Sequence, residues 1–188
     1  MDSMNYPLPE SAGRIPGVHV QRLQTRSDER GTLTEVFRNE WQPTAVPVQW
    51  NHVRSQANTL RGVHVHIRHT DHLLVLSGTM WLGLVDLREG SAHFGHSTVI
   101  ELKGTEPTLV SIATGVGHGF YFPEPTDLLY SVTHYWDPVT DELGCRWDDP
   151  ALGLGWPVSD PILSPRDRDA TSLADLLETL RRCQDKPW

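Results

Sequence analysis

From Val18 onward, the chain is a series of short runs in which apolar and polar residues alternate. Alternation with a period of two is typical of a strand with one buried face, and turn residues such as Gly, Pro and Asp separate the runs. Many short strands joined by turns predict an all-β sandwich or barrel. The expected strands are 18–24, 32–37, 46–53, 60–66, 72–76, 79–87, 97–102, 108–113, 118–122 and 128–136.

The spacing changes near the end of the chain. Leucines at positions 173, 176, 177 and 180 recur with the i, i+3, i+4, i+7 pattern of a helix. We therefore predict one amphipathic helix that packs on the β domain. The expected organisation is an N-terminal tail (1–16), a β domain (17–168) and a C-terminal helical segment (169–188).

Some of the expected strands are apolar on both faces. Val63 and Val65 lie on one side of the strand 60–66, and the strand 72–76 (HLLVL) is almost wholly apolar. Strands of this kind need cover on both faces. A second sheet can supply one cover and a second subunit the other, so we expect a homodimer.

Length, charge and cysteine content limit the number of domains, the partners and the compartment that we expect. The 188 residues suit one domain, and the net charge of −8 argues against nucleic acid as a partner. The two cysteines, Cys145 and Cys183, are far apart, which indicates a reducing cytoplasm and no disulfide framework. Residues 1–13 are acidic and contain proline, unlike a signal peptide, and no apolar run suits a membrane span.

The candidate chemistry gathers in residues 64–72. Four histidines and one aspartate fall within these nine residues: His64, His66, His69, Asp71 and His72. In an extended chain His64 and His66 project to the same face. A strand that served packing alone would have little use for two adjacent imidazoles, because buried polar groups need partners.

The spacing of these residues is similar to the metal-binding signature of cupins. Residues 64–78 read H-x-H, then an acid, then Gly, and residues 113–118 read A-x-G-x-x-H, with Asp for the usual Glu and Ala for the usual Pro. Three imidazoles and a carboxylate suit Zn, Fe, Mn or Ni. The expected ligands are His64, His66, Asp71 and His118. The alternative is that these histidines face solvent or form hydrogen bonds without a metal.

We interpret the other two histidines of the stretch, His69 and His72, as loop and strand residues outside this site.

Longer segments carry a family resemblance. They include DERGTLTEVF (28–37), QWNHVRS (49–55), LRGVH (60–64), VDLREGSAHFG (85–95), YSVTHYW (130–136), GCRWDDP (144–150) and the tail GWP…LSPRD (155–167). In this order they resemble the dTDP-4-dehydrorhamnose 3,5-epimerase family, from about Val18 to Arg166. The resemblance implies a dimeric double-stranded β-helix (cupin jelly roll) whose substrate is a nucleotide-diphosphate 4-keto-deoxysugar.

The resemblance also implies roles. A C–H bond next to a ketone is acidic, so a base can remove the proton from one face and an acid can return it to the other. The matching residues are His64 as base, Asp149 as its carboxylate partner and Tyr130 as acid. The implied substrate contacts are Arg30, Glu35, Gln49, Asn51, Arg61, His118 and Trp136.

Three positions depart from the family pattern. His66 replaces a glutamine, Asp71 replaces a lysine that would stabilise the enolate, and Leu82 replaces an aspartate. A divalent metal in the place of the lysine charge would account for the first two changes, and would suit an epimerase of a single position. His64, however, cannot be both a metal ligand through its substrate-facing nitrogen and the base.

Three functions therefore stay open. The first is an epimerase or isomerase of a nucleotide-diphosphate 4-keto-deoxysugar. The second is a metal-dependent cupin enzyme of another class, such as an oxygenase, dehydratase or lyase. The third is a non-catalytic sugar-nucleotide binding module, because a fold alone does not fix function.

Overall fold

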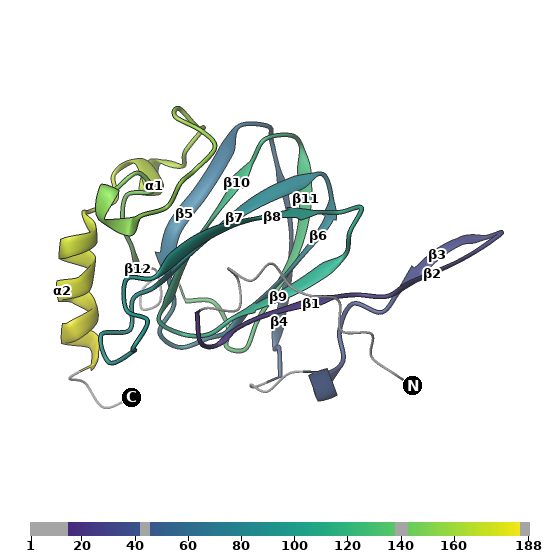
Figure 1. The fold of residues 1–188 in the computed structure, drawn as a ribbon, viewed down its shortest axis with the longest axis horizontal. Coiled ribbons are helices and arrows are strands. Elements are labelled where there is room, and N and C mark those ends of the chain that lie inside the picture. Colours follow the sequence, from purple (N-terminus) through teal and green to yellow (C-terminus); the bar gives the residue numbers. More distant parts are fainter. Residues whose placement is uncertain (1–14, 42–45, 138–142, 185–188) are drawn as a thin grey trace.

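Two five-stranded antiparallel sheets pack face to face in a computed structural model that describes residues 15–41, 46–137 and 143–184 (Figure 1). The first sheet has the order β1 (Val18–Arg22), β9 (Thr108–Ile112), β6 (Asp71–Ser77), β11 (Thr126–Val132) and β4 (Gln49–Ser55). The second has the order β12 (Leu143–Gly144), β5 (Thr59–Val65), β10 (Val116–Phe122), β7 (Thr79–Asp86) and β8 (Ser97–Lys103). The all-β prediction is confirmed.

The core lies between the sheets and follows the alternation of the sequence. Leu73 and Val75 point inward from β6, and Leu82 and Leu84 point inward from β7; all four are at most 3% exposed. Because side chains of a strand alternate between its faces, the same strands also have outward-facing residues that need cover.

The chain itself covers much of these outer faces. The helix α2 (Leu173–Gln184) packs Leu176 and Leu180 against Val63 and Val65 outside the second sheet. On the first sheet, Leu74 is 3% exposed and packs in a cluster with Leu23 and Leu109, against which Val36 and Trp41 also pack. Most of the apolar residues from which the sequence predicted a second subunit are thus covered within one chain, but Leu76 of β6 is 46% exposed, and the homodimer stays a prediction.

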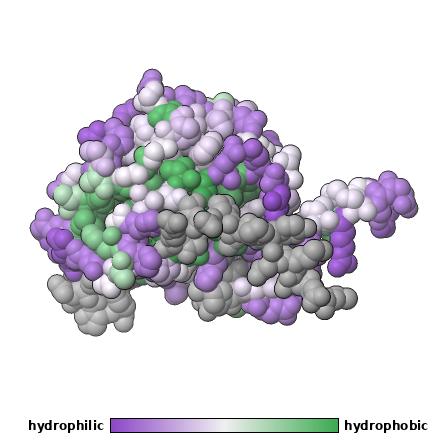
Figure 2. Space-filling view, in the orientation of Figure 1, coloured by the Kyte–Doolittle hydropathy of each residue, from purple (hydrophilic) through white to green (hydrophobic). Residues whose placement is uncertain are grey.

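A two-stranded hairpin projects from the sandwich. It consists of β2 (Thr25–Asp28) and β3 (Gly31–Thr34), and it stands clear of the rest of the described surface (Figures 1 and 2). Its apolar residue Leu33 is 70% exposed. The remaining elements are short: η2 (Asn39–Trp41), η3 (Pro150–Leu152) and α1 (Pro165–Arg168). None of the helices in the described residues is long and apolar enough to cross a membrane.

An irregularity in β5 decides where its side chains point. His64 pairs with His118 of β10, but Arg61 pairs with Phe120, so one extra residue of β5 lies between these pairs. In a regular strand Arg61 and His64 would face opposite sides, whereas the bulge allows both to line one cavity. Gly62 has φ +121°, and a Cβ there would lie 2.7 Å from the Cα of Gly119. The bulge therefore requires glycine.

We predict that Gly62→Ala lowers the free energy of unfolding by about 1–3 kcal/mol, because alanine meets both a strained φ and the backbone of β10. The matched control is Gly155→Ala, where no atom lies within 4 Å of the added methyl group. That control should change stability by less than about 0.5 kcal/mol. Urea unfolding of both variants measures the difference, and equal stabilities would contradict the role of Gly62.

Candidate functional site

A pocket of about 270 Å³ lies between the two sheets. Its walls come from β4, β6 and β11 on one side, from β5 and β10 on the other, and from the segment around α1. The polar and aromatic residues that line it are Arg61, His64, His66, His69, Asp71, His118, Phe120, Tyr130, Trp136, Ser164, Arg166 and Asp167.

His64 is paired with a buried carboxylate. Its Nε2 lies 2.6 Å from Oδ1 of Asp167, which is 5% exposed. Ser164 caps α1: its Oγ donates to Oδ2 of Asp167 at 2.9 Å and accepts from the backbone N–H of the same residue at 3.1 Å. The capping interaction thus fixes the carboxylate that orients the imidazole.

Burial by itself would raise the pKa of Asp167, but the hydrogen bonds from His64 and Ser164 outweigh it, and the pKa lies below its usual range. The ionised carboxylate accepts a hydrogen bond from the N–H at Nε2 of His64. Nδ1 is then the ring nitrogen of His64 that remains for proton transfer, and the carboxylate stabilises the imidazolium formed.

The carboxylate that the family resemblance predicted for His64 was Asp149, and the structure corrects this assignment. Asp149 accepts hydrogen bonds from the backbone N–H groups of Ala151, at 3.0 Å, and Leu173, at 2.8 Å. It caps η3 and the start of α2, and it does not line the pocket. The capping pattern of the LSPRD segment signals a helix start with an acid at its third position, but only the fold brings Asp167 to His64.

Tyr130 lines the same pocket from β11. Since β11 belongs to the first sheet and His64 belongs to the second, the two titratable side chains approach the pocket from opposing walls. This arrangement suits transfer of a proton from one face of a bound molecule to the other.

The pocket also contains three of the predicted substrate contacts. Arg61 donates from Nε to Oγ of Ser55 at 3.2 Å, and Trp136 lines the pocket with 48% of its surface exposed. His118 is the third and is 2% exposed.

The other four predicted substrate contacts do not line this pocket. Gln49 and Asn51 lie on β4 and bond to each other, from Nε2 of Gln49 to Oδ1 of Asn51, at 3.0 Å. Arg30 lies at the tip of the projecting hairpin, where its side chain is 84% exposed and pairs with Asp28. Glu35 follows the hairpin and pairs with Arg38.

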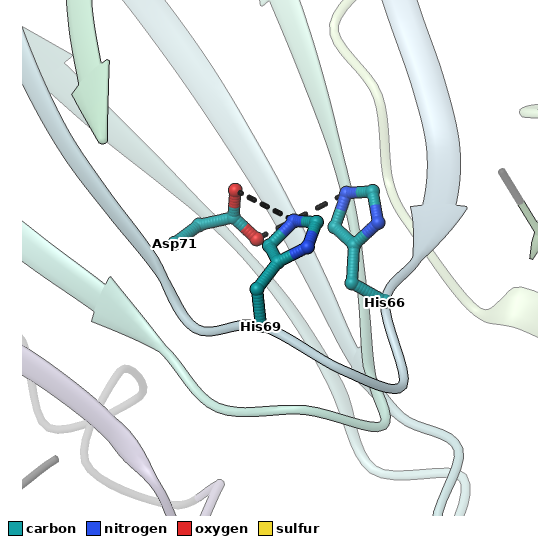
Figure 3. A group of neighbouring side chains, drawn as sticks. All are labelled: His66, His69 and Asp71. Carbon is teal, nitrogen blue, oxygen red and sulfur yellow. Dashed lines mark ion pairs between the residues drawn. The ribbon is translucent and has the colours of Figure 1, made fainter. Parts of the chain in front are cut away.

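Three imidazoles surround the buried carboxylate of Asp71, which is 4% exposed. The Nε2 atoms of His66 and His118 lie 4.0 and 3.8 Å from Oδ2, and the Nε2 atom of His69 lies 3.7 Å from Oδ1. Figure 3 shows His66 and His69 turned toward Asp71 from the loop between β5 and β6. The side chains of His66, His69, Asp71 and His118 are called the histidine–aspartate cluster below.

His69 was interpreted from the sequence as a loop residue, and the structure places it in a loop that also lines the pocket. It does lie in the loop after β5, but the loop folds back so that its ring stacks on His66 with a centroid distance of 4.1 Å. His69 is 2% exposed. His72 lies in β6, where its Nδ1 is 2.8 Å from Oγ of Ser111.

Burial sets the proton state of His118. Its removal from water lowers the pKa to about 4, although the charge of Asp71 acts in the opposite direction. Burial would raise the pKa of Asp71, but its contacts with His69 and the other imidazoles lower it overall. Near neutral pH the cluster therefore pairs a neutral His118 with an ionised carboxylate.

Stability should fall on mild acidification. The unfolded chain protonates His118 near its ordinary pKa of about 6.5, whereas the folded protein resists this until about pH 4. The unfolded state therefore binds more protons in this window, and stability is lost as pH falls through it. Urea unfolding at pH 7 and pH 5, with a chelator present, should show about 1–2 kcal/mol less loss for His118→Gln than for the wild type. Equal losses would contradict this assignment.

Comparisons with known proteins identify the family of the chain. The family model described as dTDP-4-dehydrorhamnose 3,5-epimerase matches residues 12–175. The dTDP-4-dehydrorhamnose 3,5-epimerase of Neisseria gonorrhoeae is 33% identical over 92% of this chain, which spans only 55% of that protein's length. The dTDP-4-dehydrorhamnose 3-epimerase of Streptomyces niveus is 30% identical over 90% of this chain and 88% of its own.

A solved structure gives the same result for the fold. The dTDP-6-deoxy-D-glucose-3,5-epimerase of Legionella pneumophila, in complex with dTDP-4-keto-L-rhamnose, superposes with a TM-score of 0.80 at 31% identity. The match covers 87% of this chain and 93% of that one. The chain therefore belongs to the dTDP-4-dehydrorhamnose 3,5-epimerase family, with the cupin jelly-roll fold.

Proposed function

We propose that this protein epimerises a nucleotide-diphosphate 4-keto-deoxysugar by moving a proton at a carbon next to the ketone. The observation that carries the proposal is the pair of opposing groups in one pocket: His64, held by Asp167, on one wall and Tyr130 on the other. Family membership supports it and favours it over an enzyme of another class. A module that only binds would have no need of a base and an acid on opposite sides.

The proposed reaction has two proton transfers. Nδ1 of His64 takes the proton from C3 or C5, and the electron pair of the broken C–H bond moves onto the C4 oxygen as an enolate. The enolate then collapses and takes a proton from the Tyr130 hydroxyl at the opposite face of the same carbon, which inverts it. Asp167 stabilises the imidazolium while the enolate exists.

The remaining groups suit the rest of the substrate. Arg61 and Arg166 line the pocket, and a guanidinium is a planar, permanently charged partner for a diphosphate. Trp136 is half exposed at the same pocket, where a nucleobase can stack on its ring. The pocket volume of about 270 Å³ suits a sugar, so the nucleotide would extend beyond it.

We also propose a homodimer, now on the evidence of the projecting hairpin. Its strands β2 and β3 pair with each other, and nearly all their residues are exposed. An isolated two-stranded hairpin is marginally stable in water, so a covering surface is expected. A second copy would cover Leu33. It would also give a role in the dimer to Arg30 and Glu35, which do not line the pocket of their own chain.

Proton exchange tests the reaction. With dTDP-4-keto-6-deoxyglucose in heavy water, we expect deuterium to be incorporated at C3, C5 or both. NMR or mass spectrometry measures this incorporation. Asp167→Asn should slow the exchange by about 10²–10⁴-fold, the usual contribution of an oriented acid–base group. Asp149→Asn, the matched control, should stay within several-fold of wild type because this residue is a helix cap. Absence of exchange with every 4-keto sugar nucleotide would overturn the proposal.

Sedimentation analysis tests the assembly. The wild type should have twice the mass of the 21.2 kDa chain, and Leu33→Arg should shift it to the monomer. Phe94→Arg, which adds the same charge at another exposed apolar residue, should leave the dimer intact. A monomeric wild type, or equal behaviour of the two variants, would contradict dimerisation through the hairpin.

A further inference from the structure

We infer that the histidine–aspartate cluster is a site for one divalent transition metal ion, held by His66, His69, Asp71 and His118, and that His64 is not one of its ligands. This set differs from the one that the sequence motif predicts, because His69 takes the place of His64. The inference rests on distances, on the tautomer of His118 and on the separate partner of His64.

The distances fit an ion between the side chains. The three Nε2 atoms lie 3.7 to 4.0 Å from the carboxylate oxygens, which is too long for hydrogen bonds. Two ligand atoms that each lie about 2.0–2.1 Å from one Zn²⁺ are separated by about 3.3 Å in a tetrahedron and never by more than about 4.2 Å. The three nitrogen–oxygen distances fall inside this range, and one ligand atom each from His66, His69 and Asp71 lies within 4.8 Å of the other two. These three residues form the core of the site, and His118, which is 3.8 Å from the same carboxylate, would rotate toward them to complete the coordination.

The tautomer of His118 points a lone pair at the carboxylate. Its Nδ1 lies 3.2 Å from the carbonyl oxygen of Val116, which only accepts hydrogen bonds, so Nδ1 carries the proton. Nε2 is then the ring nitrogen that faces Oδ2 of Asp71, at 3.8 Å, and it is the nitrogen through which His118 would bind a metal ion. The Val116 contact is also the kind of outer hydrogen bond that orients metal-ligating histidines.

The ligands are fixed by the fold and still face the pocket. His118 lies within β10, Asp71 begins β6, and all four residues of the cluster line the pocket. A metal held by three imidazoles and one carboxylate retains coordination positions for a substrate or water. Zn²⁺, Fe²⁺, Mn²⁺, Co²⁺ and Ni²⁺ all suit such a mixed nitrogen and oxygen set.

His64 is engaged elsewhere. Its Nε2 is 2.6 Å from Asp167, on the other side of the pocket from β6. From the sequence, His64 was assigned both as the base and as a metal ligand, and one nitrogen cannot serve both roles. In the structure the base and the metal ligands are separate residues, so this conflict does not arise. If the proposed epimerisation is right, on which this last step rests, the ion would also supply the positive charge that an enolate needs beside Asp71.

Binding of Co²⁺ to the full-length protein, stripped of metal with a chelator, tests the site without relying on activity. We expect one ion per chain by calorimetry and elemental analysis, and the visible absorption of a nitrogen- and oxygen-ligated Co²⁺. His69→Gln and Asp71→Asn should each weaken Co²⁺ binding by at least tenfold. His64→Gln is the matched control and should bind with the wild-type stoichiometry. Circular dichroism checks that each variant is folded.

Two results would overturn the inference: no stoichiometric Co²⁺ binding by the folded wild type, or loss of binding in His64→Gln with retention in His69→Gln. Deuterium exchange separates this inference from the proposed function. Exchange by a protein that binds no metal would leave the epimerase and remove the metal site. Stoichiometric binding without exchange on any 4-keto sugar nucleotide would leave the metal site and remove the epimerase.

Discussion

The packing of two antiparallel sheets against each other is the constraint on which the site depends. Each strand has one face that points into the shared interior, so its inward residues must either pack together or line the pocket. On β6, Leu73 and Val75 pack in the core, while Asp71 at the start of the strand lies in the pocket. The site is therefore the polar end of the same interior that stabilises the fold.

That interior is a costly place for charge, and the two buried carboxylates that line the pocket are matched in different ways. Asp167 has direct hydrogen bonds from Ser164 and His64, so its charge is satisfied within the chain. Asp71 has three imidazoles around it at distances beyond hydrogen bonding. These distances leave room for a cation between Asp71 and the imidazoles, whereas the direct hydrogen bonds of Asp167 leave none. This contrast is the physical reason for assigning a cation to Asp71 alone.

The separation of these two carboxylates also separates two kinds of chemistry. The pair of His64 and Asp167 has the form of an oriented base, and it faces Tyr130 across the pocket. The histidine–aspartate cluster lies beside this pair, and none of the described residues that line the pocket is a lysine. A family member that has replaced a fixed side-chain charge by a set of metal donors would keep the proton transfer and change how the enolate is stabilised.

The sequence by itself determined most of the strands, the final helix and most of the groups in the pocket, but it did not predict β2 or β12. Periodicity is a local property, so the alternation around Leu73 and the leucine spacing of 173–180 survive into the structure almost unchanged. Contacts across the fold are different. The pairing of His64 with Asp167 joins residues 103 positions apart, and only α1 and its Ser164 cap bring them together, which is why Asp149 was chosen wrongly from the sequence.

The same reason explains His69 and Arg61. The alternation of apolar and polar residues does not predict how a loop folds back after a strand, so it does not predict that His69 stacks on His66. It also fails where a bulge adds a residue, as at Gly62, which turns Arg61 to the side of His64. The sequence thus determined which chemical groups are present and on which strands. The tertiary structure decided which of them meet, because side-chain proximity depends on register, bulges and loops that no local pattern encodes.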